Sequence, residues 1–307
     1  MRIAVKFSVK SFDLFGYLVL SAAFLGCTLI PTQEEKRTFT IEKDWIRPAP
    51  KTENMGVRKT VRFAPLISDN SLIVANGVDG VSSWNRETGN VQWRFPVQNG
   101  VEGGIGLVKD RLFFGGSDGQ FYSINTSGKL LWSFPTRAEN LSEPLIAEGN
   151  VYFLAGNNML FSLDAESGRQ NWVYSRQETV PFSVRGGAKP LLLGSTLYAG
   201  FSDGVLVGLE ASKGTVKWEK ILNRGKKFKD LDSSIVSDGL SLFVAGYDDA
   251  IYSVAPTTGE INWKLNKGAF GAVTWSADRL WASTSQGEVI CLDRASGKEI
   301  WTQKLKY

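Results

Sequence analysis

The sequence predicts an all-β fold, a β-propeller of four-stranded antiparallel blades, and three observations carry this prediction. A Gly-x-x-x-Trp motif occurs six times along the chain. A second turn signal, which is Asp-Gly in three of the six units, lies nine or ten residues before most of these glycines. Short runs of alternating apolar and polar residues, rich in β-forming side chains, separate the turns. Four strands in a repeat of about 40 residues are typical of a propeller blade.

The repeated tryptophans set the period of the fold. They are Trp93, Trp132, Trp172, Trp218, Trp263 and Trp301, and the successive spacings are 39, 40, 46, 45 and 38 residues. Each falls on the last strand of its unit, where we expect it to pack against the neighbouring blade. The period-two alternation excludes a solenoid of helices, and a β-sandwich would not reuse one signature six times.

The first unit shows how four strands fit into one repeat. Strands are expected over 64–67, 72–76, 81–85 and 91–95, with Gly, Asn or Asp at the turns that require a positive φ. The same division along the chain gives six complete blades. They cover about 63–97, 103–137, 142–176, 186–221, 231–266 and 269–305, within one propeller domain over 38–307.

Cys291 occupies a repeated position at which the other units have a small residue. The equivalent residues are Ser83, Ser123, Ser162, Gly208 and Ser253. We therefore expect a packing role for this cysteine, because nothing near it in the sequence is arranged to activate its thiol.

Residues 1–26 have the pattern of a bacterial lipoprotein signal peptide. Scattered positive charge precedes an apolar run, Leu14–Leu25, that is too short to span a bilayer comfortably. The following Gly26-Cys27 resembles a lipobox, which implies cleavage before Cys27 and acylation of its thiol, as with palmitate. Residues 27–37 then form a lipidated cysteine and a flexible tether. An ordinary signal peptide and a buried hydrophobic helix are the alternatives.

Composition excludes several classes of function. The chain has no histidine, so it contains no His-based catalytic triad and no His-ligated metal site. Its net charge of +4 falls to about +2 without residues 1–26, which gives no electrostatic reason to bind nucleic acid. No P-loop, complete dinucleotide fingerprint or nucleophile elbow occurs. We predict no catalytic residues, no metal site and no cofactor.

The repeat, as in Ala165-Glu-Ser-Gly-Arg-Gln-Asn-Trp172, resembles the PQQ-like repeat of quinoprotein-type propellers. One branch of that superfamily comprises pyrroloquinoline quinone dehydrogenases. Another, the BamB family, comprises non-catalytic lipoproteins of the outer-membrane β-barrel assembly machinery, the Bam complex. The lipobox and the small mature size favour the BamB family, as does the lack of an adjacent-cysteine disulfide typical of many of the dehydrogenases. This resemblance implies a lipid-anchored protein at the periplasmic face of the outer membrane.

Two segments resemble the family's partner-binding region. Phe182-Ser-Val-Arg-Gly186 is similar to a Leu-x-Leu-Arg-Gly segment entering the fourth blade, and Asp230-Leu-Asp232 to an Asp-x-Asp pair entering the fifth. The two long repeat spacings contain these segments, so we expect loops 175–186 and 222–232 to form one protrusion on one face. The resemblance implies that Phe182, Val184, Arg185, Asp230 and Asp232 bind POTRA domains of the BamA-like barrel insertase.

Two alternatives to this interpretation stay open. Arg185 could instead pair with Asp230 or Asp232 and merely close the two loops. The whole protein could also be an envelope propeller that binds an unknown ligand or, less favoured, a quinone-dependent dehydrogenase, because a fold does not fix a function.

The number of blades does not match the family. BamB-like propellers have eight blades, whereas six complete units occur here, together with an isolated strand-like segment at 38–48 that contains Trp45. The last unit already has its own fourth strand, so this segment has no evident place. We expect the ring to be incomplete because the sequence is cut short at Tyr307, rather than closed with fewer blades.

Overall fold

The structure is a computed structural model that describes residues 44–48, 64–176, 187–225, 228–231, 233–269 and 271–305. The chain divides into two compact units. The smaller one contains Met1–Ala49 and Glu87–Gly89, and the larger one contains Pro50–Arg86 and Asn90–Tyr307. Within the described residues there is no helix long and apolar enough to cross a membrane.

The described residues of the larger unit form six four-stranded antiparallel sheets, which confirms the predicted fold class. In each sheet the strands pair in chain order, because a short turn joins each strand to the next. The first three sheets are β1 (Leu66–Ser68), β2 (Ser71–Asn76), β3 (Gly80–Asn85) and β4 (Val91–Pro96); β5 (Ile105–Val108), β6 (Arg111–Gly115), β7 (Gln120–Asn125) and β8 (Leu130–Pro135); and β9 (Leu145–Ala147), β10 (Asn150–Ala155), β11 (Met159–Asp164) and β12 (Gln170–Ser175). The other three are β13 (Leu191–Leu193), β14 (Thr196–Gly200), β15 (Val205–Glu210) and β16 (Val216–Ile221); β17 (Val236–Ser237), β18 (Leu242–Ala245), β19 (Ile251–Val254) and β20 (Ile261–Leu265); and β21 (Thr274–Ser276), β22 (Arg279–Ser283), β23 (Glu288–Asp293) and β24 (Glu299–Lys304).

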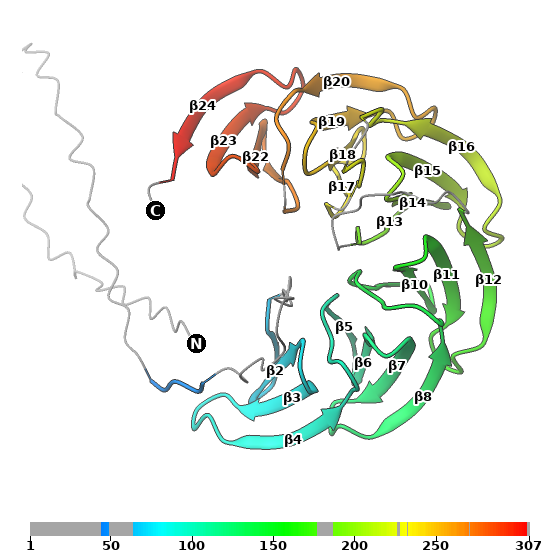
Figure 1. The fold of residues 1–307 in the computed structure, drawn as a ribbon, viewed down its shortest axis with the longest axis vertical. Helices are drawn as coiled ribbons and strands as arrows, with labels where there is room; N and C mark the ends of the chain where they lie inside the picture. Colours follow the sequence, from blue (N-terminus) through cyan, green and yellow to red (C-terminus); the bar gives the residue numbers. More distant parts are fainter. Residues whose placement is uncertain are drawn as a thin grey trace, which may run out of the picture. The chain divides into compact units, whose positions relative to one another are not determined.

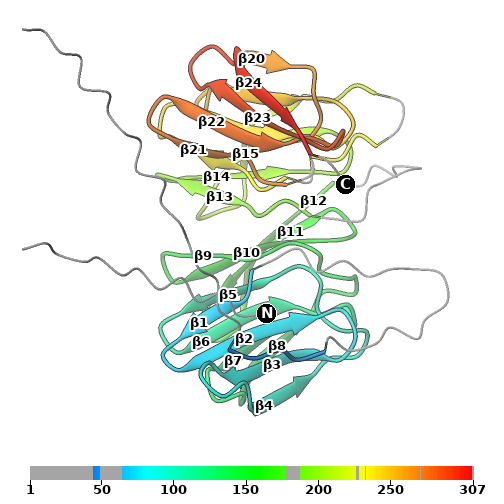
Figure 2. The ribbon, with the colours of Figure 1, turned by 90° about the vertical axis from the view of Figure 1, so that its left-hand side faces the viewer.

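The hydrophobic core lies between the sheets. Five clusters of buried side chains each join one sheet to the next along the chain, and Figure 1 shows the sheets following one another in this order. At the junction of the second and third sheets, the rings of Phe121 and Phe153 stack with their centroids 3.9 Å apart. Among the described residues no core cluster joins the first sheet to the last, and Figure 2 shows these two sheets apart.

The repeated tryptophans form the same contact at every junction. In each of the first five sheets, the tryptophan of the outermost strand lies on the Gly-x-x-x-Trp turn of the next sheet. The Trp172 ring, for example, covers Gly214, and its Nε1 donates a hydrogen bond of 2.9 Å to the carbonyl oxygen of Ala211. Equivalent indole hydrogen bonds of 2.9–3.2 Å join Trp93 to Thr126, Trp132 to Ala165, Trp218 to Pro256 and Trp263 to Arg294.

This contact explains why the motif needs glycine. Gly214 has a φ of +69°, in the left-handed region that side chains disfavour, and a Cβ atom there would lie 2.6 Å from the Trp172 ring. The expected packing of the tryptophans against neighbouring blades is therefore confirmed. The motif therefore fixes each sheet to the next through a contact between tryptophan and glycine.

In the smaller unit, Trp45 makes a contact of the same kind. Its ring lies against Gly89, which has a φ of +65°. Nε of Arg47 donates a hydrogen bond of 2.8 Å to the carbonyl oxygen of Gly89, and Nη2 donates one of 3.1 Å to that of Thr88. Residues 44–48 form no strand, so the predicted strand over 38–48 is absent from its described part, although Trp45 behaves as the blade tryptophans do.

Cys291 occupies a small-residue position at the centre of its sheet. It pairs with Trp281 on one side and with Trp301 on the other, so its side chain lies between two indole rings on one face. The cysteine is a free thiol and is buried. These contacts agree with its predicted packing role.

Candidate functional site

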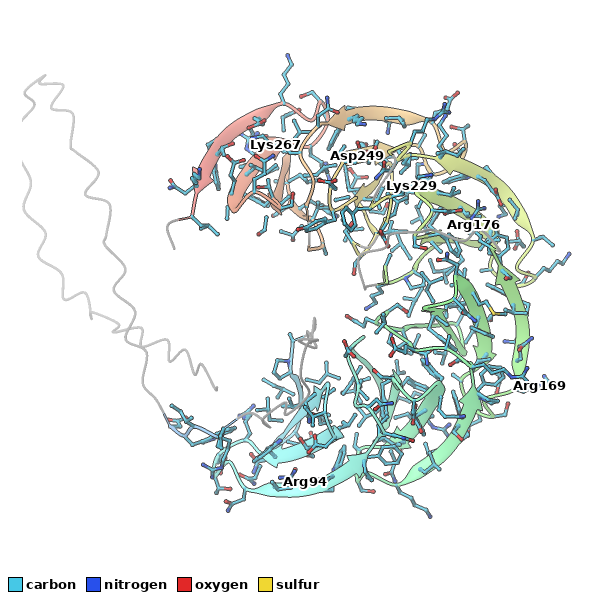
Figure 3. All side chains as sticks on the ribbon, viewed as in Figure 1. Arg94, Arg169, Arg176, Lys229, Asp249 and Lys267 are labelled. Carbon is cyan, nitrogen blue, oxygen red and sulfur yellow. The ribbon has the colours of Figure 1, made fainter. Side chains whose placement is uncertain are left out.

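The candidate site involves the two long connections of the larger unit, from β12 to β13 and from β16 to β17. Most of the predicted contact residues lie outside the described residues: Phe182, Val184 and Arg185 in 177–186, and Asp232 in the second connection. Cys27 is outside them too. The described parts are the ends of both connections and residues 228–231. Figure 3 labels Arg176 and Lys229, one on each connection.

A cluster of four polar side chains holds the start of the first connection. Arg176 directly follows β12, and its Nε donates a hydrogen bond of 2.7 Å to Asp203 in the β14–β15 turn of the next sheet. Its Nη1 donates to Glu219 on β16 at 3.0 Å and to the hydroxyl of Tyr174 at 3.1 Å. That hydroxyl donates in turn to Glu219 at 2.6 Å. The cluster therefore ties the third sheet to the fourth.

Burial and charge shift the pKa values in this cluster. Burial, together with the hydrogen bond to Glu219, raises the pKa of Tyr174 to about 12. The hydrogen bond from Tyr174 lowers the pKa of Glu219, and Arg176 lowers it further. Burial alone would lower the pKa of Arg176, but its bonds to Asp203, Tyr174 and Glu219 outweigh burial and raise it. Arg176 and Glu219 are thus both charged near neutral pH.

The lowered pKa of Glu219 predicts a dependence of stability on pH. A carboxyl with a depressed pKa contributes stability above its ordinary value of 4.5 and loses it as the pH falls through the folded-state pKa. We expect the melting temperature of Glu219→Gln to fall less than that of wild type between about pH 5 and pH 3. Differential scanning fluorimetry would measure this difference. Glu260→Gln, an exposed glutamate outside the cluster, is the control, and equal slopes for Glu219→Gln and wild type would contradict the assignment.

The second connection is fastened to the fourth sheet by its backbone. The amides of Leu222 and Asn223 donate to the carbonyl oxygen of Gly204 at 2.9 and 3.2 Å. The Asn223 side chain bridges the segment, because its Oδ1 accepts from the Gly225 amide and its Nδ2 donates to the carbonyl oxygen of Phe228. Phe228 has a φ of +48°. Asn223 therefore joins the described residues on either side of this part of the connection.

Asp230 is buried, although we expected it to be exposed on a protrusion. Its side chain is only 2% exposed, and the neighbouring Leu231 is 1% exposed and belongs to the core between the fourth and fifth sheets. The Leu231 amide donates to the carbonyl oxygen of Phe201. The length of the connection led to the expected exposure, but its apolar Leu231 draws the preceding carboxylate into the interior.

The end of the first connection lies against the segment that joins β8 to β9. Gly187 packs on Ser142 in the segment between β8 and β9, where a Cβ atom would be 3.1 Å from the Ser142 amide nitrogen. Two residues later, Nζ of Lys189 lies 2.5 Å from Glu143. Because the hydroxyl of Ser142 also bonds to the backbone of Leu154 on β10, this end of the connection is anchored to the third sheet.

The described residues bring together few side chains suited to metal binding or to holding a small molecule. They contain no group of three or more cysteine, aspartate or glutamate side chains that could hold a metal ion. A hollow of about 510 Å³ at the junction of the third and fourth sheets is lined mainly by polar side chains, including Asn150, Ser162 and Asn171. Asn171 donates a hydrogen bond of 2.8 Å to Asn150, so these groups largely satisfy each other.

The Arg176 cluster was missed in the sequence. In the sequence, Asp203-Gly204 stands out only as one of the repeated turn signals. In the first and fifth sheets an aspartate of the corresponding turn pairs with a cation of its own sheet, Asp79 with Arg94 and Asp249 with Lys264. Arg176 instead reaches the turn of the next sheet. The signal in the sequence was the position of Arg176. It is the first residue after the last strand of its repeat, and it begins one of the two long connections.

Comparisons with known proteins agree on one family. The family model for the outer membrane protein assembly factor BamB matches residues 54–303. The BamB of Nitrosomonas eutropha is 27% identical over 76% of this chain and 54% of its own length, so the chain spans about half of that relative. The crystal structure of BamB from Moraxella catarrhalis has 24% identity and a TM-score of 0.71, covering 82% of this chain and 78% of its own.

A more distant structural neighbour shares the fold alone. A europium-containing methanol dehydrogenase has 13% identity and a TM-score of 0.56, covering 66% of this chain and 51% of its own. The family model, in contrast, extends over most of the chain and all six sheets. The chain therefore belongs to the family of the outer membrane protein assembly factor BamB.

Proposed function

We propose that the protein is a non-catalytic scaffold lipoprotein of the outer-membrane β-barrel assembly machinery. The observation that carries this proposal is the family match over residues 54–303, together with relatives named as assembly factors. The lipobox-like Gly26-Cys27 supports a lipid anchor at the outer membrane that leaves the propeller facing the periplasm.

The proposed binding site is the face formed by the two long connections. Phe182, Val184, Arg185 and Asp232 contact POTRA domains of the barrel insertase, whereas Asp230 is buried beneath this face. The Arg176 cluster supports this role, because it fixes the base of the first connection to the fourth sheet through four polar side chains. A binding surface on rigidly anchored loops loses little entropy on association.

Charge reversal at Arg185 tests the site. We expect Arg185→Glu to weaken binding to purified POTRA domains at least about tenfold, since it would place a like charge against acidic partner groups or against Asp232. Biolayer interferometry with a soluble form beginning at Thr28 measures the affinity, after circular dichroism has verified folding. Arg169→Glu, an exposed arginine between β11 and β12 and outside both long connections, is the matched control. Equal affinities for both variants and wild type would remove Arg185 from the interface.

A further inference from the structure

The hollow at the junction of the third and fourth sheets has a counterpart one junction earlier, where an arginine of the chain itself bridges two sheets. Arg111 is the first residue of β6 in the second sheet, and its guanidinium reaches the β11–β12 turn of the third sheet. Its Nη1 donates to the carbonyl oxygens of Ala165 and Glu166 at 3.4 and 3.1 Å, and its Nη2 donates to the Glu166 carboxylate. At this position a guanidinium therefore joins one sheet to the next.

On the third sheet, Asn150 takes the place of Arg111. It is the first residue of β10 and pairs with the last residue of β9, as Arg111 pairs with the last residue of β5. The asparagine side chain is shorter than that of arginine and stays within its own sheet. Its Nδ2 donates to the carbonyl oxygen of Glu148, and its Oδ1 accepts from Asn171. Asn150 lines the hollow, so the hollow lies where a guanidinium lies at the earlier junction.

On the fourth sheet, the turn beside the hollow repeats the turn that Arg111 contacts. Ala211 and Ser212 line the hollow and are the first two residues of the β15–β16 turn. They correspond to Ala165 and Glu166, because the repeated tryptophan of the preceding sheet donates its indole hydrogen bond to the carbonyl oxygen of Ala211 as it does to that of Ala165. The hollow is therefore bordered by the same two backbone carbonyl groups that accept hydrogen bonds from a guanidinium one junction earlier.

The charge at the hollow is compatible with a bound cation. Arg169, labelled in Figure 3, lines the hollow and would repel a second cation if its charge were isolated. Hydrogen bonds from Ser167 lower the pKa of Asp164, and the charge of Arg169 lowers it further, so a carboxylate accompanies this arginine. In the second sheet Lys129 directly precedes the outermost strand, as Arg169 does in the third, and Arg111 bridges the junction beside it.

We propose that the hollow between the third and fourth sheets binds the guanidinium of an arginine side chain supplied by a partner protein. The occupant is identified by the chain itself, because the equivalent carbonyl groups bind Arg111 one junction earlier. A planar guanidinium carries five N–H donors in a fixed arrangement, which suits two neighbouring carbonyl oxygens better than the ammonium of lysine does. The hollow, of about 510 Å³, has room for a whole arginine side chain.

This contact is separate from the proposed POTRA face. The hollow lies where β12 and β16 begin, whereas the two long connections leave from the ends of these strands. The inference therefore goes beyond the proposed scaffold function and does not depend on it.

Titration with N-acetyl-L-arginine amide, followed by nuclear magnetic resonance of the ¹⁵N-labelled protein, tests the proposal. We expect saturable shifts of the Ser212 backbone amide and the Asn171 side-chain amide, with a Kd of about 1 mM. N-acetyl-L-citrulline amide has nearly the same shape without the charge. It should bind at least about tenfold more weakly, because hydrogen bonds from a charged donor are stronger than those from a neutral one.

Two substitutions change the hollow in opposite directions. Asn150→Arg restores the residue of the earlier junction and should abolish the shifts, because its own guanidinium occupies the hollow. Asn150→Ala leaves the hollow open, so it is the matched control and should still bind the arginine probe. Ser212→Glu recreates the carboxylate of Glu166 and should tighten binding at least about threefold. This last measurement does not require Asn150→Arg to fold.

Three results would overturn the proposal: no saturable shift at Ser212 in wild type, equal affinities for the arginine and citrulline probes, or shifts that persist in a folded Asn150→Arg. None of these measurements involves POTRA domains, so a failure here is distinguishable from a failure of the scaffold function.

Discussion

Replacing Trp172 with alanine is expected to destabilise the protein by about 3–5 kcal/mol, as large-to-small substitutions of buried aromatic side chains do. Trp172 is 8% exposed and belongs to the core between the third and fourth sheets. The substitution removes its packing on Gly214 and leaves the Ala211 carbonyl oxygen without its indole donor. Urea denaturation followed by far-UV circular dichroism would measure the free energy of unfolding.

Trp301→Ala is the matched control for this change. Trp301 occupies the same position in the repeat, but it is 45% exposed among the described residues. We expect Trp301→Ala to cost less than about 1 kcal/mol. Equal losses for the two variants would mean that the tryptophan stabilises its own sheet and does not lock one sheet to the next.

Replacing Asp203 with asparagine is expected to destabilise the protein by about 3 kcal/mol, because it leaves the Arg176 charge buried with a weaker partner. The side chains of Arg176 and Asp203 are only 13% and 1% exposed, and 2.7 Å separates Nε from Oδ2. The loss should be smaller in Arg176→Met/Asp203→Asn, since that double variant removes both charges. Urea denaturation of the two single variants and the double variant gives the coupling energy.

Asp79→Asn is the control for the buried pair. Asp79 occupies the equivalent turn of the first sheet, but its partner Arg94 lies 3.5 Å away, and both side chains are about half exposed. An exposed pair of this kind contributes less than about 1 kcal/mol. If Asp203→Asn cost no more than Asp79→Asn, the cluster could not be what anchors the first long connection.

The fold could be predicted because the repeat shows each constraint six times. Period-two alternation, the turn glycines and Trp93 through Trp301 indicated four strands per unit, and the first unit's expected strands agree with β1–β4 to within two residues. The tryptophan's partner was harder to foresee. The motif places Gly214 four residues before Trp218, yet the ring on Gly214 is Trp172, one sheet earlier. Nothing within a single repeat encodes a contact between repeats.

The candidate site was less accessible to sequence reasoning. Extra residues in two spacings correctly marked two long connections, but length does not reveal burial. Asp230 resembled a surface contact and proved to be buried, because Leu231 beside it packs into the core. The Arg176 cluster joins residues on β12, in the β14–β15 turn and on β16, and only the packing of the third sheet on the fourth brings them together.

Titration of purified POTRA domains with the wild-type protein is the most direct test of the scaffold function. Isothermal titration calorimetry should show saturable binding at micromolar affinity or tighter, of the order needed for a stable complex between envelope proteins. No heat and no binding from a folded protein would contradict the scaffold function. The chain would then be a member of the BamB family whose propeller serves a different ligand.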